Sequence, residues 1–203
     1  MSLAARLRDA LERGRSRSPL LLPGDAMEGE EEQGAAPMPA AVLVAVVDRP
    51  EPSVILTLRP ETMRKHAGQI SFPGGRMDPG DAGPVEAALR EAQEEIGLDP
   101  AFVEVIGTAD LYRTITGFEV TPVIGVVPPG LTLTPHPGEV ADLFEAPLHY
   151  LFDPANQEEK MLEWRGRPRR YYEIDYRGRR IWGATAAMIV NLSRRLELHR
   201  EAS

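Results

Sequence analysis

A continuous run of apolar residues at positions 41–47 limits the fold of this chain more than any other sequence feature. A short valine-rich run of this kind is typical of a strand buried on both faces, which occurs where helices cover both sides of a sheet. A second strand is expected at residues 53–59, after a Pro-Glu-Pro turn signal. With the helices expected further along the chain, these strands indicate an α/β fold.

The best-marked helix of the sequence spans residues 84–96. Pro84 suits a first helical turn, Gly97 suits the position after the last turn, and Pro100 lies just beyond. The remaining pattern predicts strands at residues 102–108 and 120–127, a hairpin with strands at 169–176 and 179–182, and a helix at 184–196.

Residues 1–39 differ in composition from the rest of the chain. Three leucines recur every fourth residue near the start, which predicts a short amphipathic helix, and two acidic side chains among them argue against a transit peptide. Residues 24–39 hold five acidic and no basic side chains among glycines, alanines and prolines, so we expect a flexible acidic linker. The folded domain is therefore expected to cover residues 40–200.

Composition excludes several classes of function. The chain has 203 residues, no cysteine and a formal net charge of −8. Disulfides, thiolate zinc sites and iron–sulfur clusters are therefore excluded, and non-specific binding to nucleic acid is not expected of so acidic a chain. Because no apolar run approaches the roughly 18 residues of a membrane span, we expect a cytoplasmic protein without membrane contact.

Three glutamates of the predicted helix 84–96 lie on one side of it. Glu91, Glu94 and Glu95 are spaced i, i+3 and i+4, so they fall within an arc of about 100°, separate from the apolar face of the helix. Like charges at this spacing repel, and a divalent cation would reverse the sign of that interaction. Oxygen ligands beside a glycine-rich loop suit Mg²⁺ or Mn²⁺, which bind through a few carboxylates and substrate phosphates.

The loop and the helix together resemble the signature of the Nudix hydrolases. That signature runs from a glycine through five residues to an acid, then through seven residues to Arg-Glu-apolar-x-Glu-Glu-x-Gly-apolar. This chain matches it with Gly75, with Asp81 where glutamate is usual, and with residues 90–98. Eight residues instead of seven separate Asp81 from Arg90.

The residues before this signature resemble the coenzyme A diphosphatase branch of the family. They read Leu-Thr-Leu-Arg at 56–59, then Arg64, Gly68 and Phe-Pro-Gly-Gly at 72–75, with Pro60 where a small residue is usual. The same branch tolerates an aspartate and one extra residue in its signature, so both departures support the resemblance. The resemblance covers about residues 40–196, outside the first forty residues.

The resemblance implies an α/β/α sandwich with a mixed β-sheet and a hydrolase assisted by Mg²⁺ or Mn²⁺. Its substrate would be coenzyme A or a derivative, cleaved at the diphosphate to 3′,5′-ADP and 4′-phosphopantetheine. The implied metal ligands are Glu91 and Glu95. Among the implied catalytic residues, Glu94 would be a further ligand or align the water, Arg90 would hold the carboxylates, and Glu139 would be a further carboxylate. The implied substrate-binding residues are Arg59, Arg64, Lys65, Gly74 and Gly75.

Other interpretations remain open at this point. The protein could hydrolyse another nucleoside diphosphate derivative, such as ADP-ribose, or be a non-catalytic binding module. An RNA-binding surface on the arginine-rich residues 165–180 is disfavoured, because acidic side chains interrupt it. We expect a small-molecule substrate and no nucleic acid as partner, and a homodimer is compatible with the sequence.

Overall fold

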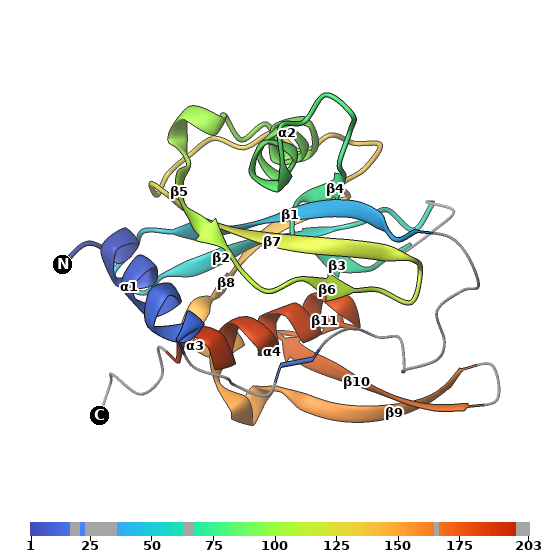
Figure 1. The fold of residues 1–203 in the computed structure, drawn as a ribbon. Coiled ribbons are helices and arrows are strands. Elements are labelled where there is room, and N and C mark those ends of the chain that lie inside the picture. Colours follow the sequence, from blue (N-terminus) through green and yellow to red (C-terminus); the bar gives the residue numbers. More distant parts are fainter. Residues whose placement is uncertain (17–20, 23–35, 63–66, 165–166, 198–203) are drawn as a thin grey trace.

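The computed structural model describes residues 1–16, 21–22, 36–62, 67–164 and 167–197. A mixed eight-stranded sheet forms its centre, with the order β3-β2-β1-β7-β5, and with β4 on β1, β6 on β7 and β8 on β2 (Figure 1). The strands of this sheet are β1 (Met38–Val47), β2 (Ser53–Leu58), β3 (Ile70–Ser71), β4 (Gly74–Arg76), β5 (Glu104–Thr108), β6 (Tyr112–Arg113), β7 (Phe118–Val127) and β8 (Asp142–Pro147).

Helices cover both faces of this sheet. Figure 1 shows α2 on one face, and α1 and α4 on the other, together with a three-stranded sheet of order β11-β10-β9. The predicted α/β/α sandwich with a mixed sheet is therefore confirmed. The remaining elements are α1 (Leu3–Arg15), α2 (Pro84–Ile96), α3 (Leu148–Phe152), α4 (Ala184–Leu196), β9 (Glu158–Trp164), β10 (Arg167–Tyr176), β11 (Arg179–Trp182) and the 3₁₀ turns η1 (Pro100–Phe102) and η2 (Pro154–Asn156).

The apolar run of the sequence is the central strand β1. It pairs in parallel with β7 along its whole length and antiparallel with β2 and β4. Alternate side chains of a strand point to opposite faces, and Ala41 and Leu43 are buried against α2 while Val44 and Val46 are buried in the cluster that includes α1 and α4. Helices on both sides explain why no polar residue interrupts this strand.

Helix α2 begins and ends where the sequence predicts. Pro84 is its first residue, and Gly97 takes the left-handed conformation (φ 67°) and donates its N–H to the carbonyls of Ala92 and Gln93. A residue with a side chain is strained in that conformation, so glycine ends the helix here. The predicted helix α4 and the hairpin of β10 and β11 also have the expected bounds to within two residues.

Helix α1 is present as predicted but is not an appendage. Leu3, Leu7 and Leu11 are all buried, and the helix packs against α4 and β5. Arg195 of α4 donates to the carbonyl of Gly14 (2.5 Å), where a Cβ would meet the backbone of Arg195. The sequence showed an apolar stripe without showing its partner, and the domain boundary expected at residue 40 stays a prediction. Most of the predicted linker lies outside the described residues.

Several short strands were missed by the sequence pattern. Strand β8 reads Asp-Leu-Phe-Glu-Ala-Pro and β9 begins Glu-Glu-Lys, so neither shows the alternation or the apolar run by which strands are recognised. The strand predicted at residues 102–108 begins at Glu104, because Asp99 accepts a hydrogen bond from Ala101 and starts the turn η1. The shorter β3, β4 and β6 are fixed by pairing with longer strands.

Candidate active site

The first part of the site is the contact between α2 and the glycines of β4. Gly74 donates its N–H to Oε2 of Glu95 (3.0 Å), and a Cβ on Gly75 would lie 2.5 Å from Oε2 of Glu91. A Cβ on Gly74 would also lie 2.4 Å from the carbonyl oxygen of Ala41. Gly74 therefore requires glycine, because a Cβ there would meet the β1 backbone, whereas a Cβ on Gly75 would displace the Glu91 carboxylate; the close approach brings the β4 backbone onto the carboxylates of the helix.

The three glutamates of α2 differ in exposure. The side chain of Glu95 is 4% exposed and that of Glu91 16%, whereas that of Glu94 is 59% exposed. Helical spacing placed them within one arc, but β4 covers only part of it. Glu91 and Glu95, the two predicted metal ligands, are thus brought together, and Glu94 lies at the solvent side of the same arc.

Arg90 ties these carboxylates to the loop before the helix. Its Nε and Nη2 each donate to one carboxylate oxygen of Asp81 at 3.0 Å, and its Nη1 donates to Glu91 (2.8 Å) and Glu94 (3.1 Å). Nη2 also donates to the carbonyl of Arg76 (3.1 Å). The planar guanidinium suits such bidentate pairing, and the hydrogen bonds from Arg90 hold the pKa of the Asp81 carboxyl below its usual value.

Burial dominates the electrostatics of the two inner glutamates. It raises the pKa of Glu95 to about 7, against the opposing effects of the Gly74 hydrogen bond and of Arg59. It also raises the pKa of Glu91, against the opposing effect of Arg90. The charge of Glu91 also raises the pKa of Glu95, and the charges of Glu94 and Glu139 raise the pKa of Glu91, so negative charge at this point is held in an unfavourable environment.

Glu139 reaches the site on a loop that is bonded to the end of α2. The N–H of Thr134 donates to the carbonyl of Ile96 (2.9 Å), and that of His136 to the carbonyl of Glu95 (2.8 Å). The Glu139 side chain is 48% exposed, and its charge contributes to the raised pKa of Glu95. Nδ1 of His136 lies 3.9 Å from its Oε1. Sequence reasoning missed His136, because its contacts with Glu95 and Glu139 form only in the folded chain.

Arg59 lies at the same point, one residue beyond the end of β2. Its Nη1 is 3.8 Å from Oε1 of Glu95, and its Nε is buried without a hydrogen-bond partner among the described residues. The structure thus brings Arg59 to the inner carboxylates, which the sequence alone did not predict. The other two predicted cations, Arg64 and Lys65, lie outside the described residues.

The donors at this site fit a hard divalent cation. They are carboxylate oxygens, and the raised pKa values of Glu91 and Glu95 reflect burial that a cation would compensate. Within the described residues, no three acidic or imidazole side chains converge as a preformed metal cage. Such an arrangement suits Mg²⁺, which is usually held by one or two carboxylates, waters and substrate phosphates.

The arginine-rich hairpin does not contribute to this site. Arg180 donates to Glu173 (2.6 Å), Lys160 donates to the same carboxylate (2.6 Å), and Arg170 pairs with Glu159 (3.2 Å). These cations are neutralised by acidic side chains of their own sheet. Across the described ranges, no helix is both long and apolar enough to cross a membrane.

Comparison with known proteins agrees with the geometry. A model of the NUDIX domain matches residues 37–165. A Cronobacter sakazakii protein named Nudix hydrolase NudL is 46% identical over 154 residues, which cover 76% of this chain and 80% of that protein. A Yersinia enterocolitica protein of the same name is 41% identical over 159 residues, covering 78% and 82%.

A solved structure is similar as well. The crystal structure of the Nudix hydrolase RenU from M. smegmatis superposes with a TM-score of 0.50 and 25% identity, over 60% of this chain and 80% of that one. The region matched by the NUDIX domain model, residues 37–165, contains β1, the glycine loop of β4 and the whole of α2. The chain therefore belongs to the Nudix family of hydrolases.

Proposed function

We propose that this protein hydrolyses the diphosphate bond of coenzyme A or a derivative, with Mg²⁺ or Mn²⁺, to 3′,5′-ADP and 4′-phosphopantetheine. The observation that carries the proposal is the position of Arg59. This residue belongs to the sequence pattern that resembles the coenzyme A diphosphatase branch, and its guanidinium lies 3.8 Å from the buried carboxylate of Glu95. Arg59, from the pattern that distinguishes the branch, therefore lies beside Glu95, from the signature that the family shares.

The residues of the chain divide the work as follows. Glu91 and Glu95 would hold the cation, which when bound would neutralise the diphosphate and activate a water molecule. Arg90 is a positioning residue, because it binds Asp81, Glu91 and Glu94 at once. Gly74 and Gly75 are assigned to substrate binding, because a backbone without side chains can approach a phosphate closely. Arg59 would bind a phosphate oxygen by a charge-assisted hydrogen bond, and Arg64 and Lys65 are assigned the same role.

Two groups are candidates for orienting the attacking water and accepting its proton. Glu94 is exposed on the same arc of the helix, and the charge of Glu139, on the loop, acts on the inner carboxylate of Glu95. Both side chains are open to solvent, at 59% and 48% exposure. We assign Glu94 and Glu139 jointly to this part of the reaction.

The principal alternative is hydrolysis of another nucleoside diphosphate derivative, such as ADP-ribose. The carboxylate site would serve that reaction equally well, so the alternative differs only in what Arg59 and its neighbours bind. A non-catalytic binding module is less well supported, because all four acidic groups of the signature are held in place, Asp81, Glu91 and Glu94 by Arg90 and Glu95 by the N–H of Gly74. A homodimer and a cytoplasmic location stay predictions.

A substrate panel tests the proposal. Coenzyme A, dephospho-coenzyme A, ADP-ribose and a nucleoside triphosphate are incubated with the full chain and either Mg²⁺ or Mn²⁺, and the products are identified by mass. Coenzyme A should give the highest kcat/KM, and 3′,5′-ADP should be its product. A clear preference for ADP-ribose would overturn the substrate assignment while leaving the Nudix chemistry in place.

A further inference from the structure

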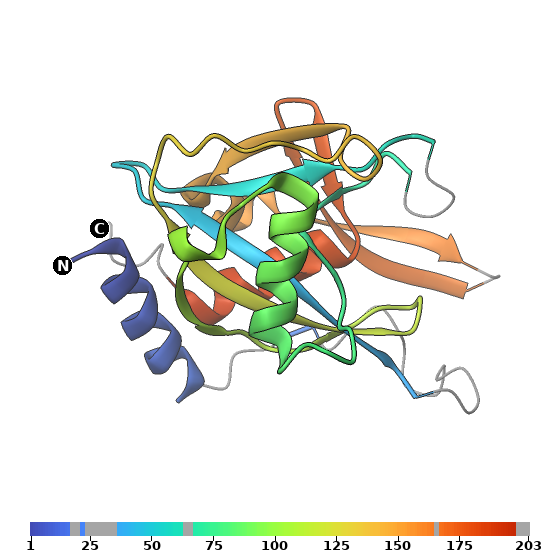
Figure 2. The ribbon, with the colours of Figure 1, turned by 90° about the horizontal axis from the view of Figure 1, so that it is seen from above.

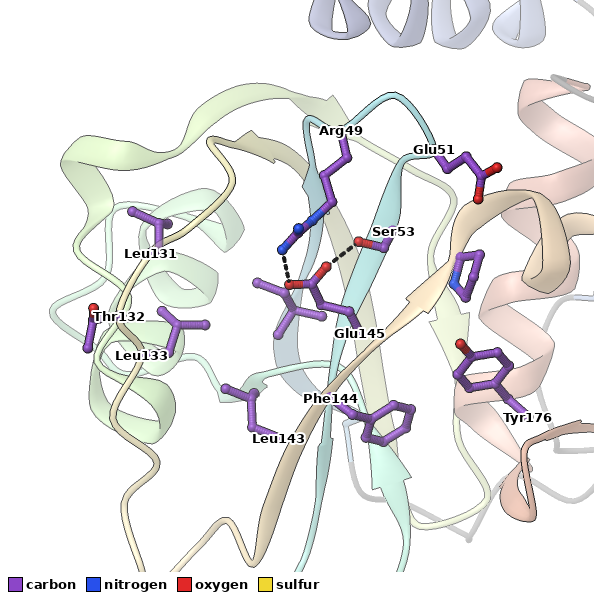
Figure 3. Close-up of a pocket in the computed structure, with 12 residues that line it drawn as sticks. Arg49, Glu51, Ser53, Leu131, Thr132, Leu133, Leu143, Phe144, Glu145 and Tyr176 are labelled. Carbon is purple, nitrogen blue, oxygen red and sulfur yellow. Dashed lines mark hydrogen bonds and ion pairs between the residues drawn. The ribbon is translucent and has the colours of Figure 1, made fainter.

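An open pocket lies along β8, and none of the predicted site residues lines it. Its volume is about 700 Å³, within the range of small-molecule sites (Figure 3). Its walls come from the turn before β2 and the first half of β2, from residues 131–133, and from β8 itself. Residues 131–133 lead directly into the loop that carries Glu139, and β8 follows that loop. The pocket is thus built from both ends of a segment that reaches the active site.

The floor of the pocket is an edge strand. Among the described strands, β8 pairs with β2 alone. The N–H of Leu148 donates to the carbonyl of Pro52 (2.8 Å), and antiparallel pairs alternate, so the backbone N–H and C=O of Glu145 point away from β2. The N–H of Leu143 agrees with this alternation, because it donates to the Asp142 side chain (2.9 Å). Glu145 therefore presents the donor and the acceptor to which an added amide can bind.

The side chains around this backbone edge are both apolar and polar. Leu133 and Leu143 lie on one side of β8, and Phe144 and Tyr176 on the other, as Figure 3 shows. The Glu145 carboxylate accepts hydrogen bonds from Arg49 (2.8 Å) and from the hydroxyl of Ser53 (2.5 Å). Its charge is thus compensated at the rim. The pocket thus offers amide-binding backbone groups beside apolar side chains, with the Glu145 carboxylate already paired.

Part of the pocket lies on the same side of the sheet as the acidic helix, while Phe144 and Tyr176 belong to the cluster on the other side. Ile55, which lines it, is buried in the cluster that contains the alanines of α2, and Leu133 and Leu143 pack against that cluster. Ile55 faces Glu145 in the β2–β8 register, and Arg59 follows four residues later. At about 3.3 Å per residue, the amide-binding edge is therefore about 13 Å from Arg59.

We propose that this pocket binds the pantetheine arm of the substrate, with the amide nearer the thiol on the backbone edge of β8 at Glu145. The arm carries two secondary amides and a pair of methyl groups between the diphosphate and the thiol. Its chain has about as many bonds as four residues of extended polypeptide, or about 13 Å, and the amide nearer the thiol lies about 11 Å along it. This assignment rests on the proposed function, since it takes the diphosphate to lie at Arg59 and the carboxylates.

The first experiment blocks the pocket from its rim. Thr132 is exposed, so Thr132→Trp can narrow the pocket without disturbing the core. Ala101, exposed beside β5 at the other edge of the sheet, gives the matched control Ala101→Trp. Two substrates are compared: coenzyme A, and the methyl ester of 3′-phosphoadenosine 5′-diphosphate, which keeps the nucleotide and the diphosphate but lacks the arm.

The measured quantity is kcat/KM for coenzyme A divided by kcat/KM for the methyl ester. Thr132→Trp should lower this ratio about tenfold, because the KM for coenzyme A rises. A change of this size is expected when one or two hydrogen bonds and their apolar surroundings are lost. The Ala101→Trp variant should keep the wild-type ratio. An unchanged ratio in Thr132→Trp would overturn the pocket assignment while leaving the diphosphatase function intact.

The second experiment does not depend on activity. Pantetheine, which has no phosphate, is added to the ¹⁵N-labelled full chain, and amide chemical shifts are followed. Shifts should change at residues 131–133 and at Glu145. Changes confined to α2 and β4, or none at all, would overturn the proposal. If coenzyme A is not hydrolysed, the proposed function fails, and this measurement alone decides whether the pocket binds the arm.

Discussion

The two faces of the large sheet carry different kinds of residue. Under α2, burial raises the pKa of two glutamates, and Glu95 is the one acidic or basic side chain among the buried residues of the described ranges. Under α1 and α4 the buried polar groups are neutral, as with Thr185 and Asn191, and the rest is apolar. One face therefore holds charge at a cost to stability, and the other supplies the stability that makes this possible.

The largest expected effect is a loss of activity when charge is removed from the side of the sheet under α2, here called the charged face. Glu91→Gln and Glu95→Gln each remove a charged oxygen with little change of shape, so kcat should fall about a thousandfold at limiting Mg²⁺ while the fold persists. Steady-state rates and circular dichroism check the two parts of this prediction. Near-normal rates in both variants would contradict the assignment of these residues as metal ligands.

Substitutions on the opposite face of the sheet, under α1 and α4, should lower the stability of the fold and leave kcat unchanged. Leu7 is 1% exposed in the contact of α1 with the domain, so Leu7→Ala should lower the free energy of unfolding by about 2–5 kcal/mol. Urea denaturation measures this loss. Leu111→Ala is the control, because Leu111 is 50% exposed.

The kcat of folded Leu7→Ala should match that of the wild type, since no predicted site residue lies in α1. A large fall in kcat with unchanged stability would show that the N-terminal helix acts on the site and not on the core. The same reasoning holds for removal of residues 1–16, which should expose the α1-binding surface of α4 and leave the catalytic groups in place.

The pH dependence of stability at one residue, Glu95, tests the difference between the two faces. The pKa of Glu95 is raised from 4.5 to about 7, so the folded protein keeps a proton that the unfolded chain releases in this window. Stability is therefore lost as pH rises from 4.5 to 7, by on the order of 3 kcal/mol at pH 8. Without metal, Glu95→Gln should be more stable than the wild type at pH 8 by about this amount.

The advantage of Glu95→Gln should vanish near pH 4, where the wild-type carboxyl is protonated in both states. Urea denaturation in the presence of a chelator at the two pH values measures it. Glu94→Gln is the matched control, because that side chain is 59% exposed and should show little change. An equal difference at both pH values would mean that packing, and not charge, sets the stability of the variant.

The sequence predicted the local parts of the charged face better than its assembly. Pro84 and Gly97 mark the ends of α2 because capping depends on neighbours in the chain. The same pattern did not show that Glu95 is buried and Glu94 exposed, because β4 covers the helix from elsewhere in the sequence. The periodicity of a sequence carries no information about contacts between distant segments.

The approach of Arg59 to Glu95 and the bond between His136 and the end of α2 depend on such distant contacts too. On the apolar face, the leucines of α1 predicted a helix, but their partner α4 lies at the other end of the chain. Strand β8 was missed because its side chains face solvent, core and pocket in turn, which leaves no simple alternation.

Phosphate binding should weaken when Arg59 is replaced. Because its charge-assisted contact is to the diphosphate, which coenzyme A and dephospho-coenzyme A share, Arg59→Gln should lower kcat/KM for both about ten- to a hundredfold. Steady-state rates with the two substrates measure this loss. Arg113→Gln is the control, since Arg113 lies in β6 and pairs with Glu119. A loss confined to coenzyme A would place the 3′-phosphate, and not the diphosphate, at Arg59.

The smallest expected effect is that of the metal ion on stability. Because a cation compensates the buried charge of Glu91 and Glu95, Mg²⁺ at about ten times its Kd should stabilise the folded protein by about 1.4 kcal/mol. For a domain of this size that raises Tm by about 3–5 °C. The same Mg²⁺ concentration should leave the Tm of Glu95→Gln nearly unchanged, although this variant starts from a higher Tm at pH 8. An equal rise in both proteins would place the bound ion away from Glu95, and the charged face would then have no cation to offset its cost.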